Sequence, residues 1–276
     1  MKSPDDLVRQ NAAAHDNVAA AYNAKHTEIY NSIEQARLDR TIDALLTLTG
    51  IAAPSVLDFG AGTGNLSLKF LDRGCSVRAV DVSSRSLDLL AAAARNRGGM
   101  ATTVLEGERL PFPDATFDVV ATYSVLHHIP DYLLSVREMT RVLKPGGLLY
   151  IDHEANETAW RNDPLLAEYR VATAMPLSEH LWQLVRTGEA FTTSFAKTAF
   201  MKAFVNRRYE REGDLHVWHD DHIDWARITV VLNEAGVSVV DSRDYLLYRP
   251  RGGQALYRRY CDVCTDMKYV IARKQR

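Results

Sequence analysis

The chain has 276 residues, 46% of them hydrophobic and 25% charged, so it can bury a full core as one large domain or one domain with an insertion. Its 33 basic and 35 acidic side chains give a formal net charge of −2, which argues against a protein that binds a nucleic-acid backbone. The N-terminal residues MKSPDDLVRQ lack the apolar segment of a signal peptide, and no apolar run approaches the roughly 18 residues of a membrane span. The cysteines, too few and odd in number for a disulfide framework, indicate a reducing compartment; they are Cys75, Cys261 and Cys264. We therefore expect a cytoplasmic protein without a membrane span.

The first predicted elements are helices between residues 7 and 48, which carry apolar residues at spacings of three and four. A break is predicted near Asn31 and Ser32, where Ser32 and Gln35 resemble a capping box, and Gly50 is predicted to stop the second helix. Short apolar runs then alternate with helical segments, which indicates βαβ units and a parallel sheet with helices on both faces. Strands are expected at residues 55–59, 76–80, 102–105, 117–121 and 148–151, with helices at 65–72, 84–96 and 131–143.

The pattern changes after this point, because residues 152–221 are helical and aromatic without a convincing strand, and we interpret them as a cap. A helix at 224–234 and strands at 237–240 and 269–272 then complete the sheet. The predicted fold is α/β, with a Rossmann-like, doubly wound, seven-stranded and mostly parallel sheet, N-terminal helices and a helical cap insertion. Its predicted parts are an N-terminal helical lid (1–50), the Rossmann-like core (51–151), the cap insertion (152–221) and the end of the core (222–276).

A glycine-rich stretch, VLDFGAGTG at residues 56–64, follows the first predicted strand. Glycine lets the main chain adopt positive φ and approach a ligand closely, and ligands of open α/β sheets bind at the carboxyl ends of the strands. A dinucleotide fingerprint would place a glycine where Asn65 stands, and a P-loop would need a Gly-Lys-Ser/Thr run that this stretch lacks. The acid two residues before Gly60 instead resembles motif I of the class I S-adenosylmethionine-dependent methyltransferases, which implies that S-adenosylmethionine is the cofactor.

That ligand has a methionine tail, a ribose and an adenine, and the sequence offers a polar partner for each. Asp58 is expected to accept from the ammonium of the tail, and Asp81, at the end of the second strand, to hold the ribose hydroxyls. Glu106 and Gly107, after the third strand, are expected at the adenine. A single acid at a strand end is most often an exposed carboxylate, but three acids at successive strand ends favour a binding site. The predicted cofactor site also contains Gly60, Ala61, Gly62, Gly64 and Val82.

The resemblance narrows with three further stretches, which are similar to the ubiquinone/menaquinone-biosynthesis branch, also called type 11 methyltransferases. They are EGERLPFPDATFDVV (106–120), TYSVLHHIPD (122–131) and RVLKPGG (141–147). One position departs from the branch, since Glu106 stands where it usually has aspartate. The resemblance implies that Tyr123 brackets the adenosyl group and that Tyr22 closes over the cofactor.

Methyl transfer requires that donor and acceptor be aligned, and it requires a base where the acceptor carries a proton. His127 and His128 are candidates for this base, because histidine titrates near neutral pH. The alternative interpretation, which the sequence favours, is that the pair packs against or orients the turn after the fourth strand. No metal is expected, because the pair Cys261 and Cys264 lacks a second pair and because a structural turn accounts better for His216, His219 and His222.

The acceptor is expected to be a small organic molecule in an apolar chamber between the sheet end and the cap. The turn after the fourth strand reads Tyr123-Ser124-Val125-Leu126 and lacks the Asp/Asn-Pro-Pro-Tyr motif of enzymes that methylate bases, which together with the net charge disfavours DNA and RNA. Two alternative functions stay open: a catalytically silent S-adenosylmethionine-binding protein, and an NAD-dependent oxidoreductase, which Asn65 disfavours. A homodimer is also left open.

Overall fold

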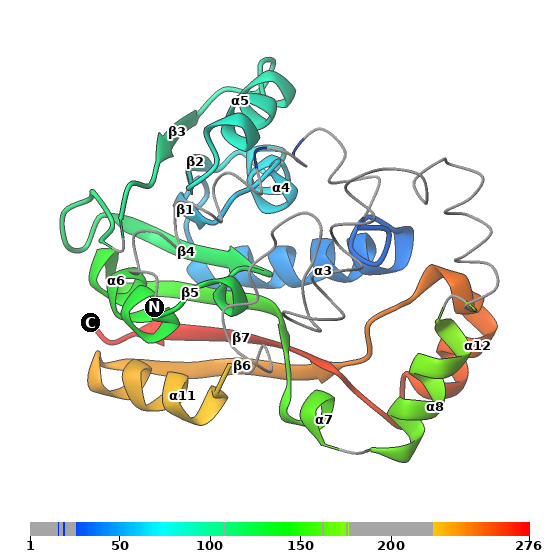
Figure 1. Ribbon diagram of the computed structural model, residues 1–276. Helices are drawn as coiled ribbons and strands as arrows, with labels where there is room; N and C mark the ends of the chain where they lie inside the picture. The colour runs from blue at the N-terminus through cyan, green and yellow to red at the C-terminus, as the bar shows by residue number, and fades with distance from the viewer. Residues whose placement is uncertain are drawn as a thin grey trace, which may run out of the picture.

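The structure is a computed structural model that describes residues 16, 19, 26–107, 109–161, 163–174, 176 and 223–276. Within these residues seven strands form one sheet in the order β3-β2-β1-β4-β5-β7-β6 (Figure 1). The first five strands pair in parallel, and β7 lies antiparallel between β5 and β6. The strands are β1 (Ser55–Phe59), β2 (Ser76–Asp81), β3 (Met100–Val104), β4 (Phe117–Tyr123), β5 (Leu143–Ala155), β6 (Val237–Tyr245) and β7 (Met267–Lys274). The predicted seven-stranded, mostly parallel α/β fold is confirmed.

Helices cover both faces of this sheet (Figure 1). The helices α3 (Ser32–Thr49) and α4 (Asn65–Leu71) pack on one face, and α6 (Tyr132–Val142) and α11 (Trp225–Glu234) pack on the other. Consecutive strand residues point to opposite faces, as β4 illustrates. Val119 lies in the same core as Leu38 of α3, whereas Val120 lies in the core that contains Met139 of α6. On the β2 side, α5 (Ser84–Ala93) packs through Leu87 and Leu90.

The start of α3 differs from the predicted capping box. The side-chain oxygen of Asn31 accepts from the backbone N–H groups of Ile33 and Glu34, at 3.1 and 2.9 Å, so that Asn31 and not Ser32 is the N-cap. Gly50 ends the helix with φ of 66°, as predicted. Glu34, three residues after this N-cap residue, is only 2% exposed and lies in the interior of the protein.

The C-terminal part contains two features that the sequence pattern did not indicate. Strand β5 continues to Ala155, beyond the predicted end at residue 151. The connection between β6 and β7 contains the short turn η4 (Pro250–Gly252) and the helix α12 (Gly253–Tyr260), which packs against α8 (Pro164–Thr173) (Figure 1). Their shared core contains Leu166, Tyr169, Leu246, Tyr260 and Cys264.

Several predictions fall on residues outside this description. Tyr22 and the rest of the lid before residue 26, apart from residues 16 and 19, lie outside the described residues, as does the stretch 177–222, which contains His216, His219 and His222. Of the predicted cap, the structure describes α7 (Glu157–Trp160) and α8. None of the helices in the described part of the chain combines the length and hydropathy needed to cross a bilayer.

Candidate functional site

A cavity lies at the carboxyl ends of β1 to β4, where the order of the strands reverses. This is the edge of an open α/β sheet at which ligands bind. Gly64 and Glu106 are not among the residues that line the cavity, and Tyr22 lies outside the described residues. The other predicted cofactor residues do line it: Asp58, Gly60, Ala61, Gly62, Asp81, Val82, Gly107 and Tyr123.

The loop after β1 requires glycine at two positions for different reasons. Gly60 has φ of 73°, and a Cβ atom on it would lie 2.4 Å from a methyl carbon of Val125. Gly64 has φ of 103°, and its Cβ would lie 2.4 Å from a methyl carbon of Leu90 on α5. Gly60 therefore keeps the main chain bare at the cavity, whereas Gly64 allows the start of α4 to approach α5 closely.

Asp58 is a buried acid on the cavity wall, only 1% exposed. Its Oδ2 accepts a hydrogen bond of 2.6 Å from the hydroxyl of Ser67 on α4. Burial, together with the negative charge of Asp81, raises the pKa of Asp58 to about 7, although the hydrogen bonds from Ser67 favour the ionised form. A cation in the cavity would stabilise the carboxylate, so the ammonium of an amino-acid ligand fits this wall.

Asp81 joins the glycine loop to the start of α5. One carboxylate oxygen accepts from the N–H of Gly62 and the other from the N–H of Ser83, both at 2.8 Å. Ser83 is the N-cap of α5, and its hydroxyl donates to Asp16 of the N-terminal segment at 2.6 Å. The carboxylate is thus fixed between two loops at the position expected for an acid that holds vicinal hydroxyls.

The wall also contains apolar and aromatic groups that sequence reasoning missed. Leu105, directly after β3, lines the cavity, whereas the neighbouring Glu106 is exposed. Ile29 and Tyr30, which precede α3, line it as well, and the Tyr30 hydroxyl lies 3.5 Å from Oγ1 of Thr63. No periodic pattern marks residues 29 and 30, because they lie in a turn before a helix.

The turn after β4 places the two neighbouring histidines in different surroundings. It contains the short helix η2 (Leu126–His128), in which His128 lines the cavity. The centroids of the His127 and His128 rings lie 3.9 Å apart. His127 instead lies with Nδ1 at 2.7 Å from Glu154, a carboxylate with no exposed surface. The other oxygen of Glu154 accepts from the N–H groups of Val125 and Leu126. The carboxylate of β5 therefore fixes the turn and orients His127.

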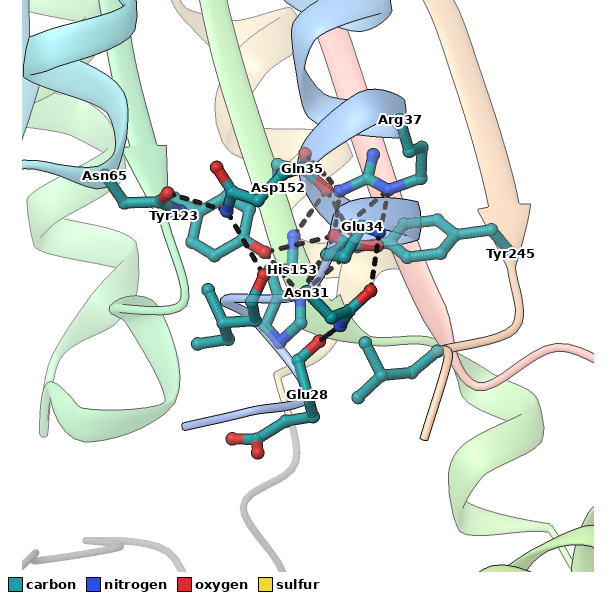
Figure 2. Close-up of polar contacts among 12 residues, drawn as sticks. Glu28, Asn31, Glu34, Gln35, Arg37, Asn65, Tyr123, Asp152, His153 and Tyr245 are labelled. Carbon is teal, nitrogen blue, oxygen red and sulfur yellow. Dashed lines mark hydrogen bonds and ion pairs between the residues drawn. The ribbon is translucent and has the colours of Figure 1, made fainter. Parts of the chain in front are cut away.

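A buried polar cluster surrounds the hydroxyl of Tyr123 and joins α3 to β4 and β5 (Figure 2). Arg37 forms ion pairs with Glu34 and, at 2.9 Å, with Asp152. Tyr123 donates to Glu34, and its hydroxyl also lies 3.0 Å from Nδ1 of His153. Burial opposes the ionisation of Glu34, but hydrogen bonds from His153 and Arg37 lower its pKa to about 2. The cluster is therefore charged at neutral pH.

Sequence reasoning missed the three polar residues 152–154 at the end of β5. The same argument that selected acids at the ends of the first three strands would have selected Asp152 and Glu154, because they follow the fifth strand at the same edge of the sheet. Among the described residues, no group of three histidine, cysteine or acidic side chains is placed to hold a metal ion.

The comparisons with known proteins agree with this geometry. Residues 57–151 match a family model described as a methyltransferase domain. The chain is 36% identical over 149 residues to a demethylmenaquinone methyltransferase of Streptomyces griseus, an alignment that covers 54% of this chain and 62% of the relative. An uncharacterized methyltransferase of Bacillus subtilis is also 36% identical, over 41% of this chain and 44% of its own length. The chain thus spans about half the length of the curated relatives it matches.

Solved structures with similar folds share little sequence with the chain. The crystal structure of an S-adenosylmethionine-dependent methyltransferase from Methanosarcina mazei aligns with a TM-score of 0.53 and 19% identity, over 85% of this chain and 97% of that one. This likeness shows the fold, and the family match identifies the domain. Residues 57–151 of the chain form a class I S-adenosylmethionine-dependent methyltransferase domain of the type 11 branch.

Proposed function

We propose that the protein transfers a methyl group from S-adenosylmethionine to a small organic acceptor. The observation that carries this proposal is the cavity of the methyltransferase domain, in which Asp58 and Asp81 stand at the ends of β1 and β2. When bound, the cofactor supplies a methyl group on a positively charged sulfur, which is a good leaving group. The chain's own part is to bind the cofactor, align the acceptor and exclude water.

The wall residues suit the three parts of this cofactor. Asp58 would accept from the ammonium of the methionine tail, where a positive charge offsets the cost of a buried carboxylate. Asp81 would hold the ribose hydroxyls, and Leu105 and Gly107 would contact the adenine. Glu106, which is exposed, is the least suited of the predicted residues to reach the adenine. Tyr22, Gly64 and Val82 stay predictions from the sequence.

The acceptor is proposed to be a small molecule held over the ends of β4 and β5. Adenosine at β2 and β3 and the methionine tail at β1 leave this end of the sheet for it. The Streptomyces griseus relative is named for demethylmenaquinone, which supports an aromatic or quinone-like acceptor. The absence of a basic excess in the chain supports a small molecule over nucleic acid, and the sparse cysteines support a cytoplasmic location. His127 and His128 stay candidates for a base.

Calorimetry with the full chain tests the binding half of this proposal. We expect S-adenosylmethionine and its demethylated product to bind, and NADH not to bind. Asp81→Ala should weaken binding of both by about 10-fold or more, because it removes a charge-assisted hydrogen-bond acceptor. Asp88→Asn, an exposed acid on α5, is the matched control and should leave the affinity unchanged. Absence of binding by the wild type would contradict the proposed function.

The transfer half is tested with a methyl-labelled cofactor and a mixture of small metabolites. We expect label to appear in a small-molecule fraction only when the protein is present. A protein that binds the cofactor but labels nothing would support the catalytically silent alternative. The fold alone does not decide between these outcomes, because the cyclase SpnF aligns with a TM-score of 0.52 and 19% identity, over 86% of this chain and 80% of that one.

A further inference from the structure

Asn65 is a polar residue of the cavity wall to which the proposed function so far gives no role. It is the first residue of α4, and it stands where a dinucleotide fingerprint would have glycine. Its side-chain oxygen Oδ1 accepts a hydrogen bond of 3.0 Å from Nε2 of Gln35 on α3 (Figure 2). Its side-chain nitrogen Nδ2 is buried and has no hydrogen-bond partner among the described residues. A buried donor without an acceptor costs free energy, so a ligand that supplies the acceptor gains affinity.

A backbone carbonyl group determines the orientation of the Asn65 amide. Nε2 of Gln35 also donates to the carbonyl oxygen of Ile29, at 3.1 Å. A carbonyl oxygen can only accept, so the Gln35 amide presents its nitrogen on this side and not its oxygen. The second hydrogen of the same nitrogen needs an acceptor as well, and the Asn65 atom beside it is therefore the oxygen. Nδ2 of Asn65 is thus on the branch of the amide that does not contact Gln35.

Asn65 and Asp58 lie at the same end of the cavity. Ser67, two residues after Asn65 in the first turn of α4, donates to Asp58 at 2.6 Å. Tyr30 belongs to this end as well, because its hydroxyl lies 3.5 Å from Oγ1 of Thr63. Burial, and to a smaller extent the charge of Asp58, raises the pKa of the Tyr30 hydroxyl, although its hydrogen bond with Thr63 lowers it. This end of the cavity therefore combines a buried carboxylate with a buried N–H donor.

A ligand that matches both groups carries a cation and an anion close together. Asp58 suits the cation, and the N–H of Asn65 suits a negatively charged oxygen, because hydrogen bonds to ionised acceptors are about twice as strong as those to neutral ones. An α-amino acid has its ammonium and its carboxylate on one carbon atom. No lysine or arginine of the described residues lines the cavity, so a carboxylate there relies on uncharged donors. The amino-acid end of the cofactor, whose ammonium is assigned to Asp58, would then have its carboxylate at Asn65.

We propose that Gln35 is a positioning residue that makes Asn65 a hydrogen-bond donor in the cavity, and that the protein thereby selects ligands with a free α-carboxylate. This inference rests on the proposed function, since it concerns the amino-acid end of the same cofactor. Gln35 itself does not line the cavity and acts through the amide that it orients. It also holds the carbonyl group of Ile29, which does line the cavity, so one side chain fixes both the segment before α3 and the start of α4.

Calorimetry with S-adenosylhomocysteine, the demethylated product, and with its carboxamide tests this selection. The two ligands differ only in the end group, which is uncharged in the carboxamide. We expect the wild type to bind the carboxylate about 10-fold or more tightly than the carboxamide. Gln35→Glu should reverse this preference. The new side chain can only accept, so Asn65 turns its nitrogen toward position 35 and presents its oxygen to the cavity, where a carboxamide N–H donates and a carboxylate is repelled.

Two variants of Asn65 and one control complete the experiment. Asn65→Asp should give the same reversal without any change at Gln35, because it replaces the donor by a second acceptor. Asn65→Ala removes the donor and should bring the two affinities to within about threefold of each other. Gln254→Glu, the same substitution at an exposed position of α12, is the matched control and should keep the wild-type preference. Each preference is a ratio of two affinities of one protein, so a general loss of stability does not reverse it.

Several outcomes overturn this inference while the proposed function stands. One is a wild type that binds the carboxylate and the carboxamide equally well. Another is a wild-type preference that persists in Gln35→Glu, which would mean that Gln35 does not orient the amide. A preference that persists in Asn65→Ala would mean that Nδ2 contacts only solvent. In all of these cases the wild type still binds the demethylated product, whereas a wild type that binds neither ligand contradicts the proposed function and the inference with it.

Discussion

Arg37 and Asp152 are separated by 115 positions in the chain, and their side chains form a buried ion pair at 2.9 Å. The guanidinium also contacts Glu34 on the same helix and lies 4.0 Å above the ring of Tyr245. One cation thus connects α3 with β5 and β6. The ion pair therefore holds α3, the helix that precedes the glycine loop, against the end of β5 (Figure 2).

Replacement of Arg37 by methionine should destabilise the protein strongly. It keeps an apolar stem of similar length but leaves Glu34 and Asp152 as buried negative charges without their shared cation. We expect the free energy of unfolding at neutral pH to fall by about 3–5 kcal/mol, as when one partner of a buried ion pair is removed. Urea unfolding followed by circular dichroism measures this change. Arg40→Met, at an exposed position of the same helix, should change stability by less than about 0.5 kcal/mol. Equal effects of the two substitutions would contradict the role of the cluster.

Glu34 should make stability depend on pH in the acid range. Its pKa is lowered from 4.5 to about 2 in the folded protein, so between these values the unfolded chain binds the proton and the folded protein does not. The contribution of Glu34 to stability is therefore fully present above about pH 5 and is lost as the pH falls toward 2. The wild type should lose about 1–3 kcal/mol more than Glu34→Gln between about pH 5 and pH 3. Urea unfolding at several pH values measures the difference, and parallel curves for the two proteins would show that Glu34 does not contribute.

The fold and the glycine loop could be predicted because their signals are local. A short apolar run followed by glycines indicates a strand end whatever the rest of the chain does, and the position of Gly60 in the structure follows from that pattern. The polar cluster gave no such signal. Glu34 and Arg37, three residues apart on a helix, look like a solvent-exposed ion pair, and only the packing of α3 on the sheet shows that they are buried.

The same limit applies to the histidines after β4. The sequence pattern does not distinguish His127 from His128 as candidates, because adjacent residues in a turn have no fixed faces. Which of the two reaches the cavity depends on Glu154, which holds His127 from a different strand. The place of His153 in the polar cluster could not be predicted either, since a bulge changes the direction of a side chain without changing the apolar pattern of the strand.

Substitution of Gly60 by alanine should impair both folding and cofactor binding. The residue has positive φ, and the added methyl carbon would lie 2.4 Å from Val125, which is fixed by the contact of its N–H with Glu154. We expect a loss of about 1–3 kcal/mol in the free energy of unfolding and a cofactor affinity at least about 10-fold lower. Thermal unfolding and calorimetry measure the two effects. Gly98→Ala is the control, because a Cβ there meets nothing within 4 Å. An unchanged affinity in Gly60→Ala would show that the loop does not approach the cofactor.

Asp58 should lower the stability of the free protein while it strengthens cofactor binding. Its pKa is raised from 3.8 to about 7, chiefly by burial, so between these values the folded protein binds a proton that the unfolded chain has released. The resulting contribution to stability is present below about pH 4 and is lost as the pH rises through 7. At about pH 8 the wild type therefore holds a buried carboxylate, and Asp58→Asn, which still accepts from Ser67, should be more stable by about 1–3 kcal/mol.

The gain should shrink at about pH 5, where the wild-type carboxyl is already protonated in the folded protein. At about pH 8 the same substitution should weaken binding of S-adenosylmethionine by about 10-fold or more, because the ammonium loses its charged partner. Urea unfolding at both pH values and calorimetry at the higher one measure these changes. A variant that is less stable than the wild type at about pH 8 and binds the cofactor equally well would contradict both the raised pKa and the assigned contact. Higher stability with unchanged binding would contradict the contact alone, since the cost of the buried charge would then serve no ligand.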